Sequence, residues 1–264
     1  MSPIRVLYHN YSPCLNLPGG GFDRSYWNVA PGYSYVGCAA EQGYATFLYD
    51  RLGWGLSDHP DPLEIVQLEL QVTIAHELIQ LLRAGGISNH TFENVVGVGH
   101  SIGSVRISGI TAQYPKDLDA AVLTGFSTDE TGQLIAFSGL DLTIASQNQP
   151  LRFSGLANRY LTANSIEGNQ YFFSRVPGFD PALLNLAEPT KQGLSVGEFL
   201  TLGISSFSPN FTGPIDVVNG DHDLPNCHGD CLVPYNKAAA VRTNSIQQRV
   251  TGPAGILLRI QGMD

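Results

Sequence analysis

Ser101 lies between two glycines in the segment VVGVGHSIGS, which runs from Val95 to Ser104. A serine hydroxyl attacks a carbonyl carbon only when a base takes its proton and nearby donors stabilise the oxyanion that forms. A sharp turn from strand to helix would expose Ser101 and aim the N–H of Ile102 at the reacting carbonyl. Gly99 and Gly103 leave the space that such a crowded turn requires. The spacing therefore favours a nucleophile of acyl transfer over a glycine-rich turn with an incidental serine.

The elements around this turn alternate between strand and helix patterns. β-Branched and aromatic runs indicate strands, whereas apolar residues spaced three and four apart indicate helices. The predicted strands are Tyr44 to Asp50, Asn94 to Gly99, Ala120 to Phe126, Pro214 to Asp223 and Gly255 to Ile260, and the predicted helices are Leu63 to Ala84, Ser101 to Tyr114 and Val233 to Val241. Such alternation is typical of a mostly parallel sheet, with its chemistry at the carboxyl ends of the strands.

The region of residues 130–208 interrupts this alternation. It is rich in Asn, Ser, Gln, Gly and Phe, with a helix-like piece near Ser195 to Leu202. We interpret it as a lid inserted into a single α/β domain that spans residues 1–264. The aromatic residues Tyr171, Phe172, Phe173 and Phe179 of this region favour an apolar substrate group, although aromatic clusters more often form a core.

Composition and charge exclude several classes of protein. The chain has 264 residues, 43% of them hydrophobic and 14% charged, which is ordinary for a globular domain. A formal net charge of −9 disfavours nucleic-acid binding, because a phosphate backbone attracts basic surfaces. The sequence contains no apolar run of 18 residues, so no membrane span is expected. We expect a small-molecule substrate and no cofactor, and the sequence leaves the oligomeric state open.

The N-terminus and the cysteines bear on the compartment and on metal binding. No apolar stretch of about 7–15 residues follows Arg5, so no signal peptide is expected. The chain as it stands is expected in the cytoplasm, with secretion left open. Cys227 and Cys231 flank His228 in PNCHGDC, but no second cluster completes the four ligands of a structural zinc site. A local disulfide or two free thiols is favoured over a metal.

Three segments together resemble the α/β-hydrolase superfamily, and most closely its fungal members with an AB hydrolase-1 type domain. They are YATFLYDRLGWGLSDHPDP, VVGVGHSIGS and VVNGDHDLPNC, in family order. The resemblance implies a mostly parallel sheet, a helical lid and a triad of serine, acid and histidine. Ser101 matches the nucleophile and Asp223 the acid that orients the imidazole. Asp221, and more weakly Asp129, are alternative acids.

The same resemblance assigns two further sets of residues. Asp50 and Arg51 match a loop that fixes the turn beside the active site, a structural role, and Trp54 lines the pocket or belongs to the core. The second donor of the oxyanion hole, beside the Ile102 N–H, is expected from Gly20 or Gly21.

The segments before these glycines fit the family pattern poorly. Pro18 stands where the family has histidine. The preceding SPCLNL contains Pro13 and Asn16 and makes a poor central strand. IRVLY (Ile4 to Tyr8) is a better strand but lies early, so the first strands of the family are expected to be missing.

The histidine of the triad is the main departure from the family. The family places it after the last strand, and no histidine follows His228 in this sequence. His228 is a weak candidate for the base, with His222 behind it. His100 adjoins the nucleophile but is expected to point elsewhere, and His76 lies in the long helix. A truncated or mis-spliced gene is favoured over a true pseudoenzyme as the cause.

These observations define two hypotheses of different classes. The first is a serine hydrolase by descent, acting on a carboxylic ester, lactone or thioester, with an incomplete triad and doubtful activity. The second is a pseudoenzyme, a binding protein or an isomerase that keeps the lid pocket for an apolar small molecule. Haloalkane or epoxide chemistry on the same fold needs a carboxylate nucleophile, and position 101 is serine.

Overall fold

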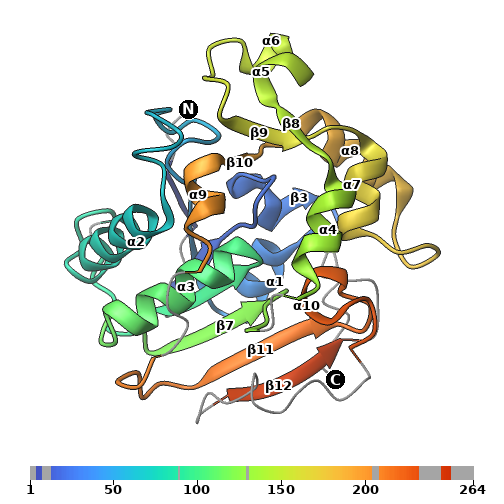
Figure 1. Cartoon of the computed structure of the whole chain (residues 1–264). Coiled ribbons are helices and arrows are strands. Elements are labelled where there is room, and N and C mark those ends of the chain that lie inside the picture. The colour runs from blue at the N-terminus through green and yellow to red at the C-terminus, as the bar shows by residue number, and fades with distance from the viewer. Residues whose placement is uncertain are drawn as a thin grey trace.

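The computed structural model has a seven-stranded sheet at its centre (Figure 1). The structure describes residues 4–7, 13–88, 90–128, 131–203, 208–231 and 245–250. The strand order is β1-β5-β2-β6-β7-β11-β12. β1 runs antiparallel to β5, and every other pair in this sheet is parallel. The strands are β1 (Ile4–Leu7), β2 (Pro13–Leu17), β5 (Ala45–Tyr49), β6 (Val96–His100), β7 (Ala120–Thr124), β11 (Ile215–Gly220) and β12 (Ser245–Val250).

Strand β2 corrects the expectation that SPCLNL is a poor strand. It lies between β5 and β6 and pairs with both. Pro13 is tolerated because it occupies the first residue of the strand, where a missing N–H costs least. One strand, β1, precedes β2, so the prediction of a strand within IRVLY is confirmed.

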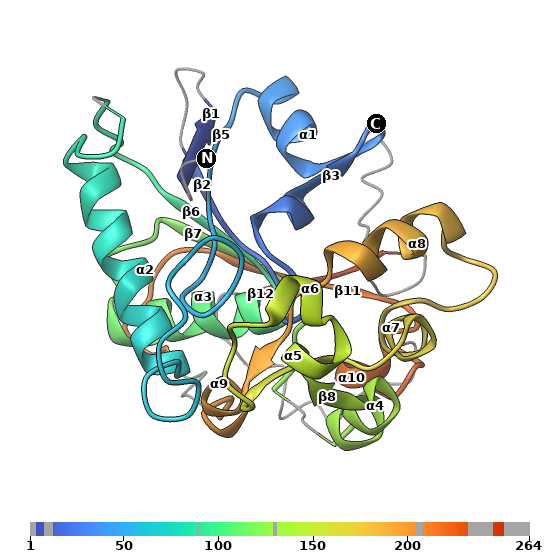
Figure 2. The ribbon, with the colours of Figure 1, turned by 90° about the horizontal axis from the view of Figure 1, so that it is seen from above.

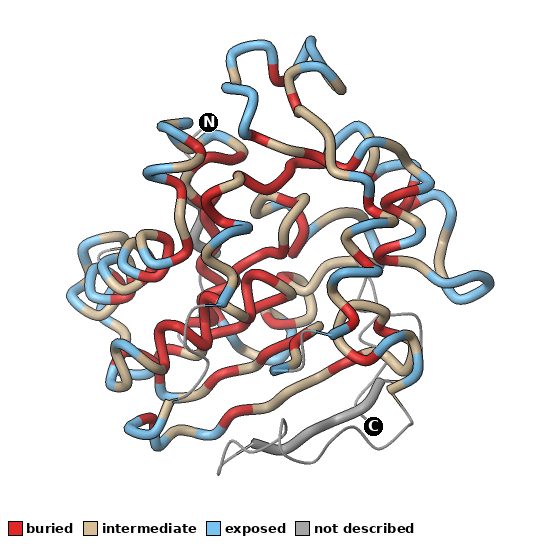
Figure 3. The backbone as a smooth tube through the Cα atoms, viewed as in Figure 1, coloured by how far each residue is buried: buried red, intermediate tan, exposed pale blue. Residues whose placement is uncertain are grey.

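Helices cover both faces of the sheet (Figure 2). α2 (Leu68–Arg83) and α3 (Ile102–Gln113) lie on one face, and α1 (Tyr35–Glu41) lies on the other. Side chains alternate along the strands accordingly: Leu15 of β2 belongs to the core cluster of α2 and α3, whereas its neighbour Cys14 packs in the cluster that contains Val36 of α1. Figure 3 places the most continuous burial in the central strands and in α3. The central strands β2 and β5 are therefore buried on both faces, as is typical of a parallel sheet, whereas most of β11 is half-buried.

Three short elements connect β2 to α1. The 3-10 helix η1 (Arg24–Trp27) follows the glycines of the loop after β2, and β3 (Asn28–Ala30) then pairs with β4 (Tyr33–Ser34). Ser34 caps α1 by accepting a hydrogen bond from the N–H of Gly37 at 2.8 Å, as the first turn of a helix favours.

An insertion separates β7 from β11 and rises beyond the carboxyl ends of the strands (Figure 1). We use "the insertion" for residues 131–203. Its strands β8 (Leu142–Ile144), β9 (Tyr160–Ala163) and β10 (Leu194–Ser195) form a separate sheet. Its helices are α4 (Gln133–Leu140), α5 (Ala145–Asn148), α6 (Pro150–Phe153), α7 (Ile166–Phe173), α8 (Pro181–Thr190) and α9 (Val196–Leu200). Its role as a lid stays a prediction.

The elements predicted next to the serine are confirmed, within a few residues at their ends. The long helix begins at Leu68 rather than Leu63, because the residues from 62 to 65 form turns instead. β12 was not predicted; its residues Ser245–Val250 carry three polar side chains in a row, which hides the strand pattern. The helix expected at Val233 to Val241 and the strand expected at Gly255 to Ile260 lie outside the described residues.

Candidate active site

Ser101 stands at the junction of β6 and α3, in the turn that its neighbours predicted. Its φ of 51° and ψ of −121° lie in a region that side-chain-bearing residues rarely adopt. A Cβ on Gly99 would lie 2.5 Å from backbone atoms of the following helix, and a Cβ on Gly103 would lie 2.0 Å from the carbonyl oxygen of Leu17. Only glycine fits at both positions. The turn therefore has the geometry of a nucleophile elbow, and the catalytic role of Ser101 stays a prediction.

The glycine loop after β2 lies directly against this turn. A Cβ on Gly19 would lie 3.3 Å from the Cβ of Ser101. The N–H of Gly21 donates to the carbonyl oxygen of Gly193 at 3.2 Å, so it is already used within the protein. Within the described residues, the N–H groups of Gly20 and Ile102 have no intramolecular acceptor. Of the two glycines considered, Gly20 therefore has the N–H group that is left to donate to a ligand, and the oxyanion hole expected from it and Ile102 stays a prediction.

Asp223 follows β11 and caps the short helix α10 (Leu224–Cys227). Its Oδ1 accepts hydrogen bonds from the backbone N–H of Asn226 at 3.0 Å and from the Nδ2 of Asn226 at 2.9 Å. Burial raises the pKa of this carboxyl to about 6, because ionisation is costly away from water. Asn226 lines the same cleft as Ser101, so the segment from Asp221 to Cys231, which we call the acid turn, reaches the cleft, although Asp223 itself is not part of the lining.

The alternative acids differ from Asp223 in their surroundings. Asp221 is only partly buried in the same turn, and Asp129 lies outside the described residues. Cys227 and Cys231 form a disulfide that closes the end of the acid turn. No cluster of three or more metal-ligating side chains occurs among the residues that the structure describes.

The described histidines do not meet Ser101 in the cleft. His228 is exposed, and its Nε2 lies 2.7 Å from the Oγ1 of Thr131. The Nδ1 of His222 lies 3.2 Å from the carbonyl oxygen of Gly229. His100 is buried, stacks on Tyr26 and hydrogen-bonds Thr124 at 2.9 Å. Burial lowers the pKa of His100 to about 4, so it is neutral at physiological pH.

The helix histidine belongs to a different region. The Nδ1 of His76 lies 2.6 Å from the Oδ2 of Asp117, and its ring stacks on Tyr114. These contacts hold His76 of α2 away from the cleft, whose lining does not include it.

A cleft of about 800 Å³, including its opening to solvent, lies above Ser101. Gly20, Gly21, Ser101 and Ile102 line its floor, and residues of the insertion line its walls. The apolar side chains of its lining are Ile102, Val105, Phe126, Phe137, Leu140, Leu142, Ala163, Phe172, Phe173, Leu194, Leu202 and Pro225. Apolar walls with few polar groups are typical of small-molecule sites.

The insertion contributes residues that the sequence patterns did not identify. Of the four aromatic residues considered, Phe172 and Phe173 line the cleft, while Tyr171 is 47% exposed and Phe179 lies outside the lining. Asn169, Lys191 and Gln192 line the cleft and are buried polar residues. No local motif marks them, because the cleft brings them together from separate elements of the insertion.

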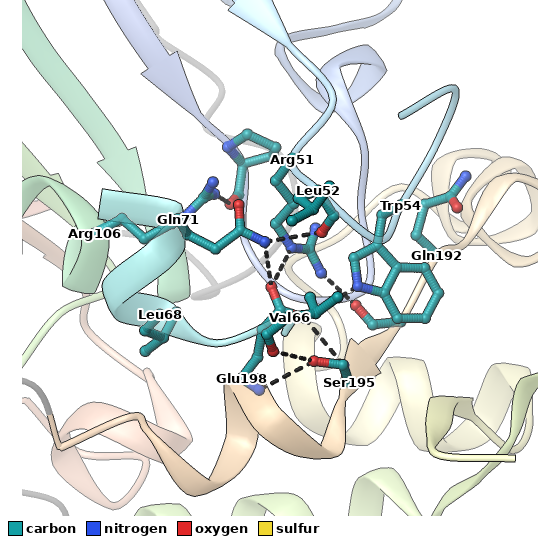
Figure 4. Close-up of polar contacts among 12 residues, drawn as sticks. Arg51, Leu52, Trp54, Val66, Leu68, Gln71, Arg106, Gln192, Ser195 and Glu198 are labelled. Atoms are coloured by element: carbon teal, nitrogen blue, oxygen red, sulfur yellow. Dashed lines mark hydrogen bonds and ion pairs between the residues drawn. The ribbon is translucent and has the colours of Figure 1, made fainter. Parts of the chain in front are cut away.

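A buried ion pair connects the insertion to the loop after β5 (Figure 4). The Nε of Arg51 donates to the Oε1 of Glu198 at 2.7 Å, and both side chains are fully buried. Arg51 also donates to the carbonyl oxygens of Phe22 and Gly193. Because Gly193 also accepts the N–H of Gly21, Arg51 positions one wall of the cleft against the glycine loop. The predicted structural role of Arg51 agrees with these contacts.

Trp54 and Asp50, which lie near Arg51 in the sequence, also make contacts that stabilise the fold. Trp54 is fully buried, and its Nε1 donates to the Oε2 of Glu198 at 3.0 Å. It therefore belongs to the core rather than to the cleft lining. Asp50 accepts hydrogen bonds from the N–H groups of Arg24 and Leu56, both at 3.0 Å, which fixes the turn after β5.

Comparison with known proteins adds a family and a set of similar folds. The profile of the Alpha/beta hydrolase family matches residues 17–243. A search of curated protein sequences found no match. No helix among the described residues is long and apolar enough to cross a membrane.

Several solved structures share the fold at low identity. BpoC of Mycobacterium tuberculosis, assigned as a non-heme bromoperoxidase, is 18% identical with a TM-score of 0.63, over 96% of this chain and 88% of that one. The enol-lactonase of Burkholderia xenovorans is 16% identical with a TM-score of 0.60, over 96% and 88%. The monoacylglycerol lipase of Paleococcus ferrophilus is 11% identical with a TM-score of 0.60, over 95% and 89%.

Proposed function

The chain belongs to the alpha/beta hydrolase family, and from this premise we propose that Ser101 is the nucleophile of a serine hydrolase. The substrate is a carboxylic ester, lactone or thioester with an apolar body. The observation that carries the proposal is the position of Ser101 at a φ of 51° on the floor of the cleft. The N–H groups of Ile102 and Gly20 border the same floor and can donate hydrogen bonds to a negatively charged carbonyl oxygen.

The proposed reaction proceeds through an acyl-enzyme. The Oγ of Ser101 bonds to the carbonyl carbon, its proton passes to a base, and the carbonyl oxygen becomes an oxyanion held by Ile102 and Gly20. The bond to the alcohol or thiol then breaks, and the leaving group takes the proton from the base. Water attacks the acyl-enzyme in the second half and releases the acid. Asp223 is the residue proposed to orient the base.

The base is not assigned among the described residues. An enzyme that lacks one member of its triad retains about 10³–10⁴-fold acceleration over water, so we expect weak hydrolysis from a chain that works without a histidine. His228 remains the weak candidate, and it would have to leave Thr131 to serve.

A fluorophosphonate probe tests the proposal without a known substrate. The probe should label the wild type faster than Ser101→Ala, and digestion of the labelled protein should place the adduct on Ser101. Labelling at the rate of the Ser101→Ala variant would refute the nucleophile. His228→Gln provides the matched test of the base: an unchanged labelling rate would remove His228 from the mechanism.

The second candidate is a binding protein that keeps the cleft without turnover. It is favoured by one observation, that no described histidine lines the cleft. This candidate predicts saturable binding of apolar ligands that survives Ser101→Ala, together with no labelling of Ser101. A thermal shift of the variant with apolar esters measures the binding directly.

A further inference from the structure

Polar side chains interrupt the apolar wall of the cleft at one place. Asn169 on α7 shares a helix face with Phe172 and Phe173, and all three line the cleft. Asn169 is 4% exposed, and Lys191, which follows α8, is 2% exposed. Buried polar groups are normally satisfied by the protein, because an unmet hydrogen bond is costly. The hydrogen-bond partners of Asn169 and Lys191 therefore decide what this part of the wall can bind.

Glu188 on α8 fixes the orientation of both side chains. The Nδ2 of Asn169 lies 2.9 Å from the Oε2 of Glu188. A carboxylate accepts hydrogen bonds, so the amide must present its nitrogen to Glu188 and its Oδ1 elsewhere. Within the described residues, this Oδ1 accepts no hydrogen bond, and it is not one of the fully enclosed unpaired atoms, so it keeps some access to solvent. It is a free acceptor on a residue of the cleft lining.

Lys191 supplies a donor that shares the Glu188 carboxylate with Asn169. Its Nζ donates to the carbonyl oxygen of Ala163 at 2.7 Å and to the Oε1 of Glu188. An ammonium group has three N–H donors, so one remains for a ligand. The charges of Lys191 and Glu188 cancel within the cluster. The site thus offers one acceptor and one donor without net charge.

We propose that this cluster is a specificity subsite for an uncharged hydroxyl group on an otherwise apolar substrate. A hydroxyl matches the site because it donates one hydrogen bond, to the Oδ1 of Asn169, and accepts another, from the Nζ of Lys191. This inference rests on the proposed function of the Ser101 cleft and names its substrate class. A carboxylate would be disfavoured, because it would place an acceptor against the Oδ1 of Asn169. An ammonium would be disfavoured, because it would place a second positive charge beside Lys191.

Binding to the Ser101→Ala variant tests the subsite without requiring turnover. The probes are methyl ω-hydroxyalkanoates, a homologous series from butanoate to decanoate, each compared with its parent methyl alkanoate by calorimetry. The series spans different lengths between ester and hydroxyl. At the matching length, we expect the hydroxy ester to bind about tenfold more tightly, as expected for satisfying buried polar groups. Analogues that end in carboxylate or ammonium should bind more weakly than the hydroxy ester.

Variants on α7 assign the preference to its residue. Asn169→Leu should lower the preference to about onefold while the parent esters still bind. Gln170→Leu removes an amide from the next residue of α7, outside the cleft lining, and should leave the preference intact. The inference is overturned if no chain length prefers the hydroxyl, if a charged analogue binds most tightly, or if the preference survives Asn169→Leu. If Asn169→Leu does not fold, the comparison of hydroxy and parent esters on Ser101→Ala alone still tests the inference.

The two proposals fail in different ways. Absence of fluorophosphonate labelling would refute the nucleophile and leave the binding preference untouched. Labelling of Ser101 combined with equal binding of hydroxy and parent esters would refute the subsite alone.

Discussion

The carboxylate of Asp223 should destabilise the fold at neutral pH, and an amide in its place should remove that penalty. The side chain is 4% exposed, and its hydrogen bonds come from Asn226, an uncharged residue. Burial raises the pKa from 3.8 to about 6. Because one pKa unit corresponds to about 1.4 kcal/mol, ionised Asp223 should lower the free energy of unfolding by about 3 kcal/mol.

The pH range of this penalty follows from the two pKa values. Below pH 3.8 the carboxyl is neutral in the folded and unfolded protein, and the penalty is absent. As the pH rises from about 4 to about 6, the unfolded chain has already released the proton that the folded protein still holds, so stability falls. Asp223→Asn should therefore exceed the wild type by about 3 kcal/mol near pH 7.5 and by close to zero near pH 3.5.

Urea unfolding followed by circular dichroism, repeated across this pH range, measures the difference directly. Comparing variant with wild type at each pH cancels the other titrating groups. Asp221→Asn is the matched control from the same turn, and as a partly exposed position it should change stability by less than about 0.5 kcal/mol. A difference that does not vary with pH, or a less stable Asp223→Asn near pH 7.5, would mean that a partner already compensates the carboxylate.

Three further perturbations follow from the same contacts. Gly103→Ala should cost about 3 kcal/mol or more, because its Cβ would lie 2.0 Å from a backbone oxygen, whereas Gly155→Ala, which meets no atom within 4 Å, should be nearly neutral; thermal unfolding compares the two. Ser101→Gly should be about 1 kcal/mol more stable than Ser101→Ala, since glycine tolerates a φ of 51°, and equal melting temperatures would contradict this. Glu198→Gln should cost about 3–5 kcal/mol by leaving the buried charge of Arg51 unpaired, and a change below about 1 kcal/mol in chemical unfolding would refute that estimate.

Local sequence was sufficient for the turn that carries Ser101. Its strand, its two glycines and its helix are consecutive, and the steric requirement at Gly99 and Gly103 acts between close neighbours and β2. The glycine loop and the turn at Asp223 were assigned through the family resemblance, and their catalytic roles stay predictions. Choosing between Gly20 and Gly21 required the structure, since the deciding contact comes from Gly193 in the insertion.

The walls of the cleft were beyond sequence reasoning for the same physical reason. Asn169 and Lys191 come together through Glu188, and each of the three looks like an ordinary surface residue of a polar segment. The strand β2 was misjudged because Pro13 was weighed without knowing that it begins the strand. β12 was missed because its polar residues conceal the period of two that marks a half-buried strand.

The Arg51–Glu198 pair also restricts how a substrate reaches Ser101. Pulling β10 and α9 away from the sheet would separate two fully buried charges and break the contacts of Gly193 with Arg51 and Gly21. That end of the insertion is therefore anchored to the sheet, whereas α4 and α7 contact α10 and each other at the other end.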